Sequence, residues 1–254
     1  MEKYIIVWSV LMLAPTKVDF DVEKKVEEFE TDGYLHISND YFLENQVDHT
    51  LLTKAQLDYY SLQEDLYGEC RARAYSRYIK SADSSDYILD TSNDYFQSKE
   101  YNYDDGGKIR TFSSISKDFL DNSLIEKIVR FDSEFALNTN IIDQNKDLII
   151  GLHQVRYKAT KESPSFSSPI WLHKDDEPVV FLHLMNLSNT AVGGDNLIAN
   201  SPREINKLIS LKEPLETLVF GQKVFHAVTP LGTECNIESF RDILLVTFSY
   251  KETI

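Results

Sequence analysis

The C-terminal half of the chain consists of short runs of β-forming residues, and this pattern restricts the fold more than any other feature of the sequence. Turn-forming residues separate the runs. From position 147 onward they are LIIGLHQVRYKA, PVVFLHLMNLS, DNLIANS, ETLVFGQ, VFHAVTP and RDILLVTFSY. Several short strands at this spacing are typical of a sandwich or a barrel, and we expect a jelly roll.

The N-terminal half predicts helices. Apolar residues recur at helical spacing in residues 19–32 and again in residues 51–67, while residues 34–38 predict a short strand. A further helix is expected to begin at Ser123, with Glu126 completing a capping box, and its apolar stripe should pack on a sheet. Helices followed by a β-rich half predict an α+β fold in which helices buttress one face of the β core.

Length and composition favour one domain. The 254 residues, 42% of them hydrophobic, suffice for a large core, and no stretch has the composition of a linker. Residues 4–14 form an apolar run of signal-peptide length, but the charge before it is weak and Pro15 follows it. We therefore expect residues 1–18 to be an apolar extension without a role in the chemistry, and residues 19–254 to form the domain.

Charge and cysteine content exclude several classes of partner. The formal net charge is -15, whereas nucleic-acid binding needs clustered Lys and Arg, so no nucleic-acid partner is expected. The apolar run over residues 4–14 is too short to cross a bilayer as a helix, so no membrane partner is expected either. Two cysteines, Cys70 and Cys235, are too few for a disulfide framework and fit a cytoplasmic protein. The sequence leaves the oligomeric state open.

Two histidines and one aspartate in the β-rich half have the composition of a metal site. His173 and Asp175 are two residues apart at the end of a predicted strand, so their side chains can point the same way and share one ion. His226 must then reach that ion from a neighbouring strand. Two histidines and one carboxylate leave coordination positions open and are the ligand set of non-haem Fe(II) oxygenases. A chance surface pair is the alternative, because the chain has six histidines and many aspartates.

Arg241 favours an oxygenase over other metal proteins. It opens the run RDILLVTFSY and shares a face with Ile243, Leu245 and Thr247, so its guanidinium is expected to point inward. A buried arginine requires an anion, and a carboxylate gives the best bidentate match. The distal carboxylate of 2-oxoglutarate would be such an anion.

The alternation of side chains along a strand indicates which other polar residues of the β-rich half could face a ligand. In residues 148–159, His153 and Tyr157 share a face; if this face looks inward, the Tyr157 hydroxyl can bond a ligand carboxylate. The alternative is a core tyrosine bonded to backbone. Ser167, in the loop before the metal segment, is a candidate second donor. His153 and His183 lie among apolar neighbours, so we expect both to be core imidazoles.

Residues 70–79 (CRARAYSRYI) predict a strand with one basic face. That face would carry Arg71, Arg73, Tyr75 and Arg77. We interpret the segment as an edge strand with this face in water, and a contact to a carboxylate ligand is the alternative. Residues 81–108 predict irregular connections with a turn at Gly106 and Gly107, and such loops often border active sites.

A resemblance to a known family covers about residues 20–254. The stretches that carry it are GLHQVRYKA, WLHKDDEPVVFLHLMNLSNTAVGGDNLIANS, GQKVFHAVTPLG and FRDILLVTFSY. They resemble the Fe(II)/2-oxoglutarate-dependent dioxygenases that hydroxylate free aliphatic amino acids. The resemblance implies O2 as a further cosubstrate, Fe(II) held by His173, Asp175 and His226, and 2-oxoglutarate held by Arg241 with Tyr157 and Ser167.

The resemblance also implies a fold and a reaction. The fold would be a double-stranded β-helix, a jelly-roll variant, with buttressing helices. The reaction would be hydroxylation of a free aliphatic L-amino acid, with L-isoleucine converted at C4 to 4-hydroxyisoleucine, coupled to oxidative decarboxylation of 2-oxoglutarate to succinate and CO2. A peptide or protein hydroxylase on the same fold and a non-catalytic metal-binding jelly roll are the alternatives. Trp171, Phe166 and the basic face over residues 70–79 are candidate substrate contacts.

Overall fold

A computed structural model of the protein describes residues 21–84 and 86–250. The apolar extension expected over residues 1–18 lies outside these residues. In the part of the chain that the structure describes, no helix is both long enough and apolar enough to cross a membrane.

An antiparallel sheet of seven strands is the largest element of the fold. Its strands are β1 (Tyr34–Ile37), β2 (Arg71–Lys80), β3 (Tyr87–Leu89), β6 (Leu148–Ala159), β7 (Val179–Leu187), β11 (Thr217–Gly221) and β14 (Ser239–Tyr250). Their order is β1-β11-β7-β14-β6-β2-β3. The last strand of the chain, β14, therefore lies in the middle and pairs with both β6 and β7.

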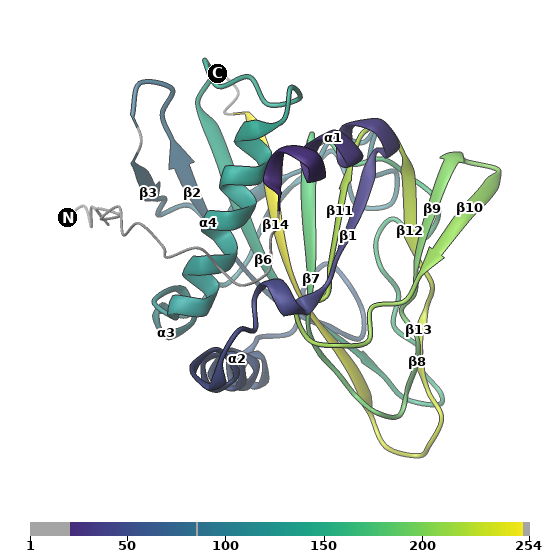
Figure 1. Ribbon diagram of the computed structural model, residues 1–254. Helices are drawn as coiled ribbons and strands as arrows, with labels where there is room; N and C mark the ends of the chain where they lie inside the picture. The colour runs from purple at the N-terminus through teal and green to yellow at the C-terminus, as the bar shows by residue number, and fades with distance from the viewer. Residues whose placement is uncertain (1–20, 85, 251–254) are drawn as a thin grey trace.

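Smaller sheets cover one face of the large sheet. Strands β9 (Asn196–Ser201), β10 (Glu204–Ile209) and β12 (Phe225–Val228) form a three-stranded sheet, and β8 (Ala191–Gly193) pairs with β13 (Leu231–Thr233). Figure 1 shows these strands on the side of the large sheet opposite the helices. Apolar side chains of the large sheet and of β9 form a common core, which includes Val180, Leu182, Ile198, Leu218, Phe220 and Ile243. This arrangement is a jelly roll, as the sequence predicts.

Helices cover the other face of the large sheet (Figure 1), which confirms the α+β prediction. They are α1 (Val22–Asp32), α2 (Gln46–Asp58), α3 (Lys117–Leu120) and α4 (Ser123–Asn138), with 3-10 turns η1 (Asn39–Tyr41) and η2 (Tyr59–Ser61). The helix expected over residues 19–32 is α1, which ends at Gly33 with a φ of 79°. Glycine suits this left-handed position because it has no Cβ.

Helix α4 buries the predicted apolar stripe but begins differently from the prediction. Leu124, Ile128, Phe131 and Phe135 are all buried. The N-cap is Asn122, whose side chain accepts a hydrogen bond from the backbone N–H of Leu124 at 2.9 Å. Ser123 is instead the first helical residue, so the predicted capping box is wrong by one position. An Asn side chain caps as well as a Ser side chain, and the sequence offers both in succession.

Helix α2 is shifted from the prediction of residues 51–67. It begins after Asn45, whose side chain accepts from the N–H groups of Val47 and Asp48, and it ends at Asp58. The ring of Tyr59 then turns into the core, where its hydroxyl donates to the carbonyl of Ile243 at 2.9 Å. This contact with β14 is a tertiary interaction, so helical periodicity alone could not place the end of the helix.

Strand β2 is not an edge strand, so the preferred interpretation of its basic face is wrong. It pairs with β6 on one side and β3 on the other. The segment expected to be irregular includes β3 and β4 (Asp94–Phe96), and β4 pairs with β5 (Ile109–Thr111). The predicted turn is present, with a φ of 81° at Gly107. Cys70 and Cys235 are free thiols.

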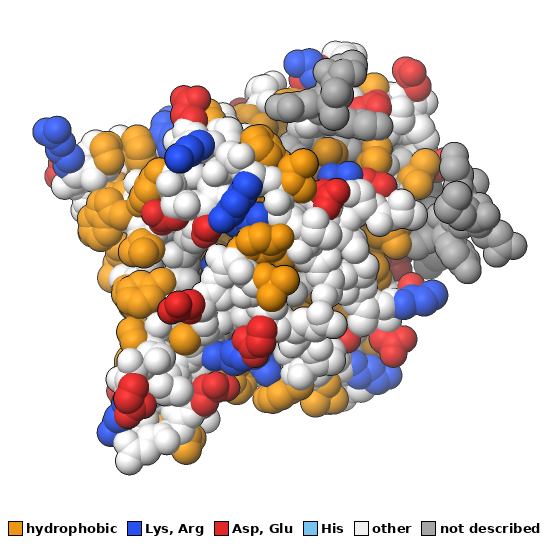
Figure 2. Space-filling model, turned by 180° about the vertical axis from the view of Figure 1, so that it is seen from behind, with side chains coloured by type: hydrophobic (Ala, Val, Ile, Leu, Met, Phe, Trp, Pro, Cys, Tyr) orange, Lys and Arg blue, Asp and Glu red, His pale blue; other side chains and the backbone are white. Residues whose placement is uncertain are grey.

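The surface carries charges of both signs. On the face seen in Figure 2, Lys and Arg side chains are dispersed among Asp and Glu side chains rather than gathered into one patch.

Candidate metal centre and ligand pocket

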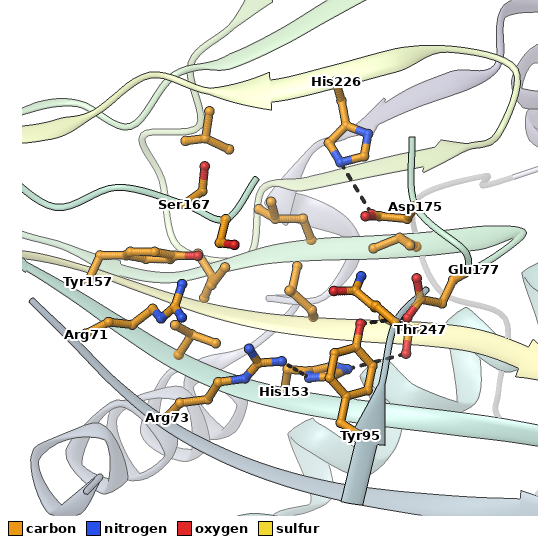
Figure 3. Close-up of a pocket in the computed structure, with 18 of the residues that line it drawn as sticks. Arg71, Arg73, Tyr95, His153, Tyr157, Ser167, Asp175, Glu177, His226 and Thr247 are labelled. Atoms are coloured by element: carbon orange, nitrogen blue, oxygen red, sulfur yellow. Dashed lines mark hydrogen bonds and ion pairs between the residues drawn. The ribbon is translucent and has the colours of Figure 1, made fainter. Parts of the chain in front are cut away.

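His173, Asp175 and His226 meet at one point of a pocket on the inner face of the large sheet. One nitrogen of each imidazole and one carboxylate oxygen lie within 4.8 Å of one another. The backbone sets this approach, because His173 N–H donates to the His226 carbonyl at 3.0 Å and His226 N–H donates to the His173 carbonyl at 2.8 Å. Figure 3 shows the imidazole of His226 directed at the carboxylate of Asp175.

Hydrogen bonds orient the ligand atoms of this cluster. The Nε2 atoms of His173 and His226 lie 3.5 and 3.3 Å from the two carboxylate oxygens of Asp175. His173 Nδ1 donates to the Trp171 carbonyl at 2.8 Å, which leaves the Nε2 lone pair free for a metal. Burial would raise the pKa of Asp175, but His226 and His173 hold it well below its ordinary value, so this group is a carboxylate at neutral pH.

This donor set fits a transition metal with open coordination positions. Two imidazole nitrogens and one carboxylate oxygen are the protein ligands of non-haem Fe(II) sites. Lone pairs at this separation repel one another unless a proton or a cation lies between them, so a divalent cation would stabilise the cluster. His226 is 8% exposed and its Nδ1 has no hydrogen-bond partner within residues 21–84 and 86–250.

Arg241, on β14, is a buried cation that has no ion-pair partner in the described part of the chain. Its side chain is 2% exposed, and Nη2 has no hydrogen-bond partner among the described residues. Burial lowers the pKa of Arg241, and the nearby Tyr157 and Asp195 only partly oppose this effect. A buried guanidinium is costly until an anion meets it, so this part of the pocket is built for a ligand with a negative charge.

Tyr157 and Arg71 lie beside Arg241 on the same face of the sheet. Tyr157 on β6 is directly opposite Arg241 on β14, and Arg71 on β2 is directly opposite Tyr157. All three line one pocket, with Tyr157 and Arg71 at the end away from His226 (Figure 3). Tyr157 is only partly buried and its hydroxyl forms no hydrogen bond within the described part of the chain, so the alternative of a backbone-bonded core tyrosine does not hold. Arg71 is ion-paired with Asp65 at 2.6 Å.

Ser167 lies in the wall of the same pocket, and its hydroxyl donates to the Pro169 carbonyl at 3.3 Å. Trp171 and Phe166, considered above as substrate contacts, are 51% and 42% exposed and are not among the residues that line this pocket.

The two histidines expected in the core differ from each other. His183 is fully buried between Asp132 at 2.8 Å and Thr217 at 2.7 Å, as predicted for a satisfied core imidazole. His153 is also buried, but it lines the pocket and its Nδ1 lies 2.5 Å from an Arg73 nitrogen. The prediction that His153 is a core imidazole is therefore wrong, because the strand face that it shares with Tyr157 points into the pocket.

Sequence reasoning missed five polar residues of the pocket wall. They are Tyr95, Gln97, Arg110, Ser168 and Glu177. The first three come from the segment around β4 and β5, which carries no regular pattern that would assign a direction to a side chain. Glu177 could have been found, because it continues the two-residue alternation of His173 and Asp175. Burial and the charge of Asp175 raise the pKa of Glu177 to about 7.

A jelly roll in which two histidines and one carboxylate converge near an unpaired buried arginine defines a class, the non-haem iron oxygenases that take an anionic cosubstrate. The family described as 2OG-Fe dioxygenase matches residues 56–247, so the chain belongs to the 2OG-Fe dioxygenase family. It is accordingly an Fe(II)/2-oxoglutarate-dependent dioxygenase that uses O2.

Two curated relatives match over most of their length. L-isoleucine-4-hydroxylase of Bacillus thuringiensis is 80% identical over 234 residues, which are 92% of this chain and 98% of that protein. 3(1)-hydroxy-L-isoleucine 4-dioxygenase of Pantoea ananatis (strain AJ13355) is 35% identical over 230 residues, 87% of this chain and 93% of that protein.

Solved structures agree with the fold. The crystal structure of IDO from Bacillus thuringiensis has a TM-score of 0.82 and 70% identity, and the match covers 92% of this chain and all (100%) of that one. A bsmA homolog from Methylobium petroleophilum PM1 has a TM-score of 0.79 at 17% identity, covering 94% of this chain and 97% of that one, and supports the fold alone.

Proposed function

We propose that this enzyme hydroxylates free L-isoleucine at C4 to give 4-hydroxyisoleucine, while 2-oxoglutarate is converted to succinate and CO2. The observation that carries the proposal is the 80% identity, over 92% of the chain, to a protein named L-isoleucine-4-hydroxylase. The name of the Pantoea ananatis relative also refers to a 4-dioxygenase of an L-isoleucine derivative. A small-molecule amino acid is therefore the expected partner.

In this proposal His173, Asp175 and His226 hold Fe(II). Support comes from the distances within the triad and from the hydrogen bond that leaves the Nε2 atom of His173 free. Bound Fe(II), with 2-oxoglutarate and O2, supplies the oxidising chemistry that replaces a C–H bond with C–OH. The protein contributes position, because the way in which the substrate is held decides which of its C–H bonds lies nearest the metal.

Arg241, Tyr157 and Ser167 bind the far carboxylate of 2-oxoglutarate in this proposal. The Arg241 guanidinium would donate to the carboxylate, and the hydroxyl of Tyr157, its cross-strand neighbour, would add a third donor. Apolar side chains of the same pocket, among them Val180, Leu182 and Phe220, would exclude water from the chain of the cosubstrate.

The environment of Arg241 also helps to decide between an enzyme and a non-catalytic metal-binding protein. A non-catalytic metal-binding jelly roll would have no use for a second, buried and unpaired cation, so the exposed fraction of 2% and the unpartnered Nη2 favour an enzyme. A peptide hydroxylase on the same fold is tested directly by the choice of substrates.

The experiment supplies Fe(II), 2-oxoglutarate and air together with single free amino acids, or with an isoleucine-containing peptide blocked at both ends. We expect 4-hydroxyisoleucine and succinate in equal amounts from free L-isoleucine. The proposal is wrong if L-isoleucine fails to stimulate succinate formation, or if the blocked peptide is the better substrate.

We also propose that residues 19–254 act as one cytoplasmic domain and that residues 1–18 take no part in it. The free thiols of Cys70 and Cys235 fit a reducing compartment. Removal of residues 1–18 should leave activity and the unfolding temperature unchanged, and loss of either would contradict the assignment.

A further inference from the structure

We propose that Arg73, Arg110 and Glu177 form the receptor for the α-carboxylate and α-ammonium groups of the substrate. The two arginines would bind the carboxylate and Glu177 would bind the ammonium. This inference rests on the proposed function, because it takes a free amino acid as the substrate. All three residues line the pocket that contains the metal ligands.

Arg73, which is partly buried, and Arg110, which is buried, have no ion-pair partner among the described residues. Arg110 is 2% exposed, and within residues 21–84 and 86–250 the Nε atom of each guanidinium lacks a hydrogen-bond partner. Burial, together with the positive charges of Arg71 and Arg110, lowers the pKa of Arg73 to about 10. Two neighbouring guanidiniums in a buried wall are unfavourable alone, and one carboxylate between them would relieve both.

The partners of both arginines are neutral. Arg73 Nη2 lies 2.5 Å from Nδ1 of His153, and burial with the charge of Arg73 holds the pKa of His153 well below its ordinary value. His153 is therefore uncharged and accepts a hydrogen bond from Arg73. Arg110 Nη2 donates to the side-chain oxygen of Gln97 at 2.9 Å. These bonds orient the guanidiniums but leave their charge uncompensated.

Tyr95 joins the two arginines to Glu177. Its ring centroid lies 5.4 Å from Cζ of Arg73 and 5.1 Å from Cζ of Arg110, and its hydroxyl donates to Glu177 Oε1 at 2.8 Å. Glu177 is 4% exposed, and its other oxygen, Oε2, has no partner among the described residues. Figure 3 shows Tyr95 between Arg73 and Glu177 on one side of the pocket. The guanidiniums thus lie over the ring of Tyr95 and the carboxyl group of Glu177 lies at its hydroxyl, so groups for both charges of a zwitterion surround one side chain.

The position differs from the one proposed for 2-oxoglutarate. On β2, Arg71 faces Tyr157 in the same row as Arg241, whereas Arg73 is one row further along and faces Val155. Arg71 also has a carboxylate partner, Asp65, and Arg73 has none in the described chain. The pocket therefore holds two separate anion positions.

Ligand analogues test the proposal without any substitution. Binding to the anaerobic enzyme loaded with Fe(II) and 2-oxoglutarate is measured by calorimetry for L-isoleucine, L-isoleucinamide and 3-methylpentanoic acid. The amide lacks the carboxylate charge and the acid lacks the ammonium group. We expect each analogue to bind at least about 10-fold more weakly than L-isoleucine, the loss typical of one charged hydrogen bond. Equal affinity for all three compounds would overturn the proposal.

Substitutions then assign each charge to a residue. Arg73→Gln and Arg110→Gln should lower the affinity for L-isoleucine by about 10- to 100-fold. The affinities for L-isoleucinamide and 2-oxoglutarate should stay unchanged. Glu177→Gln should lower the affinity for L-isoleucine but not the affinity for 3-methylpentanoic acid. Arg77→Gln is the matched control, because Arg77 lies on the same strand and face as Arg73 but is ion-paired with Asp90 at 2.7 Å.

Failure of this inference can be told apart from failure of the proposed function. If Arg73→Gln weakens 2-oxoglutarate instead of L-isoleucine, or if Arg73→Gln and Glu177→Gln both bind L-isoleucine as the unaltered enzyme does, the receptor is wrong while hydroxylation of L-isoleucine stands. If another free amino acid is the substrate and shows the same dependence on both residues, the receptor stands and the choice of L-isoleucine is wrong.

Discussion

His173 and His226 face each other across a two-bond backbone bridge, with their ring centroids 4.3 Å apart. Each residue donates its N–H to the carbonyl of the other, so main-chain atoms rather than side chains align the two imidazoles. The bridge joins the segment before β7 to β12, residues about fifty positions apart in sequence. Because the backbone holds the geometry, loss of one imidazole should leave the other in place.

This relationship predicts that His226→Ala removes iron but not the fold. The bridge uses only main-chain atoms of residue 226, which alanine retains. We expect Fe(II) affinity to fall by at least about 10-fold, since even loss of an outer partner of a metal ligand has this effect. Metal analysis after dialysis gives the iron content, and circular dichroism reports the fold. His49→Ala, on the exposed surface of α2, is the control; an unchanged iron content in His226→Ala would contradict the assignment.

Arg241→Gln should lower the affinity for 2-oxoglutarate and leave the iron content unchanged. Removing one member of a buried charge pair costs about 2–5 kcal/mol, which corresponds to a dissociation constant raised by roughly 30-fold or more. Calorimetric titration of the iron-loaded protein with 2-oxoglutarate measures this change. Arg77→Gln again serves as the control, and equal affinity in Arg241→Gln would show that the guanidinium does not contact the cosubstrate.

Gly194→Ala should disturb Arg241 indirectly. A Cβ at Gly194 would lie 2.9 Å from Cδ of Arg241, and the φ of 72° disfavours any side chain. We expect the KM for 2-oxoglutarate to rise several-fold while iron binding persists. Gly107→Ala is a matched control, since Gly107 has a similar φ of 81° but its added Cβ would meet only Lys99 in ordinary contact. The same rise in KM in both variants would mean that backbone strain, not contact with Arg241, is the cause.

His183→Leu should destabilise the fold without affecting the pocket. It would leave the carboxylate of Asp132, which is fully buried, without its partner at 2.8 Å. Breaking a buried pair on one side costs about 3–5 kcal/mol, whereas replacing both members is often close to neutral. Urea denaturation should therefore show a large loss of unfolding free energy for His183→Leu and a smaller loss for the double variant with Asp132→Leu. Equal losses would mean that Asp132 does not depend on His183.

Buried tyrosines predict the response to alkaline pH. Burial raises the pKa of Tyr78 from its ordinary value of 10.0 to about 12, with the nearby Asp121 and Glu126 acting in the same direction. A raised pKa in the folded state means that the protonated phenol stabilises the fold. This contribution is complete below pH 10 and is lost as the pH rises toward 12.

The unfolding free energy should consequently fall between pH 10 and pH 12, with a smaller slope in Tyr78→Phe. Denaturation at a series of pH values gives the slope, and the near-ultraviolet absorbance of tyrosinate follows ionisation. An identical slope in Tyr78→Phe would show that Tyr78 ionises equally in the folded and unfolded chain.

Local periodicity determined a large part of this protein from sequence alone. The alternation of a strand predicted that Arg241, Ile243, Leu245 and Thr247 share a face, and all four side chains line the pocket. Asp175 lies beside His173 as expected, but not on a strand as expected, because His173 forms only an isolated bridge and Asp175 has no regular secondary structure. Helical spacing likewise predicted α1 and the buried stripe of α4. Such patterns are readable because each depends only on residues a few positions apart.

Only the tertiary structure decided which strands are neighbours and which charges meet. Strand β2 lies inside the sheet because it pairs with β6 on one side and with β3 on the other, and the face that was expected to be solvated is a pocket wall. Tyr95 on β4 and Arg110 on its partner strand β5 likewise meet Glu177, which lies just before β7, only in the folded chain. Contacts of this kind follow from how sheets pack and which polar groups can be satisfied when buried, and no local pattern in the chain carries that information.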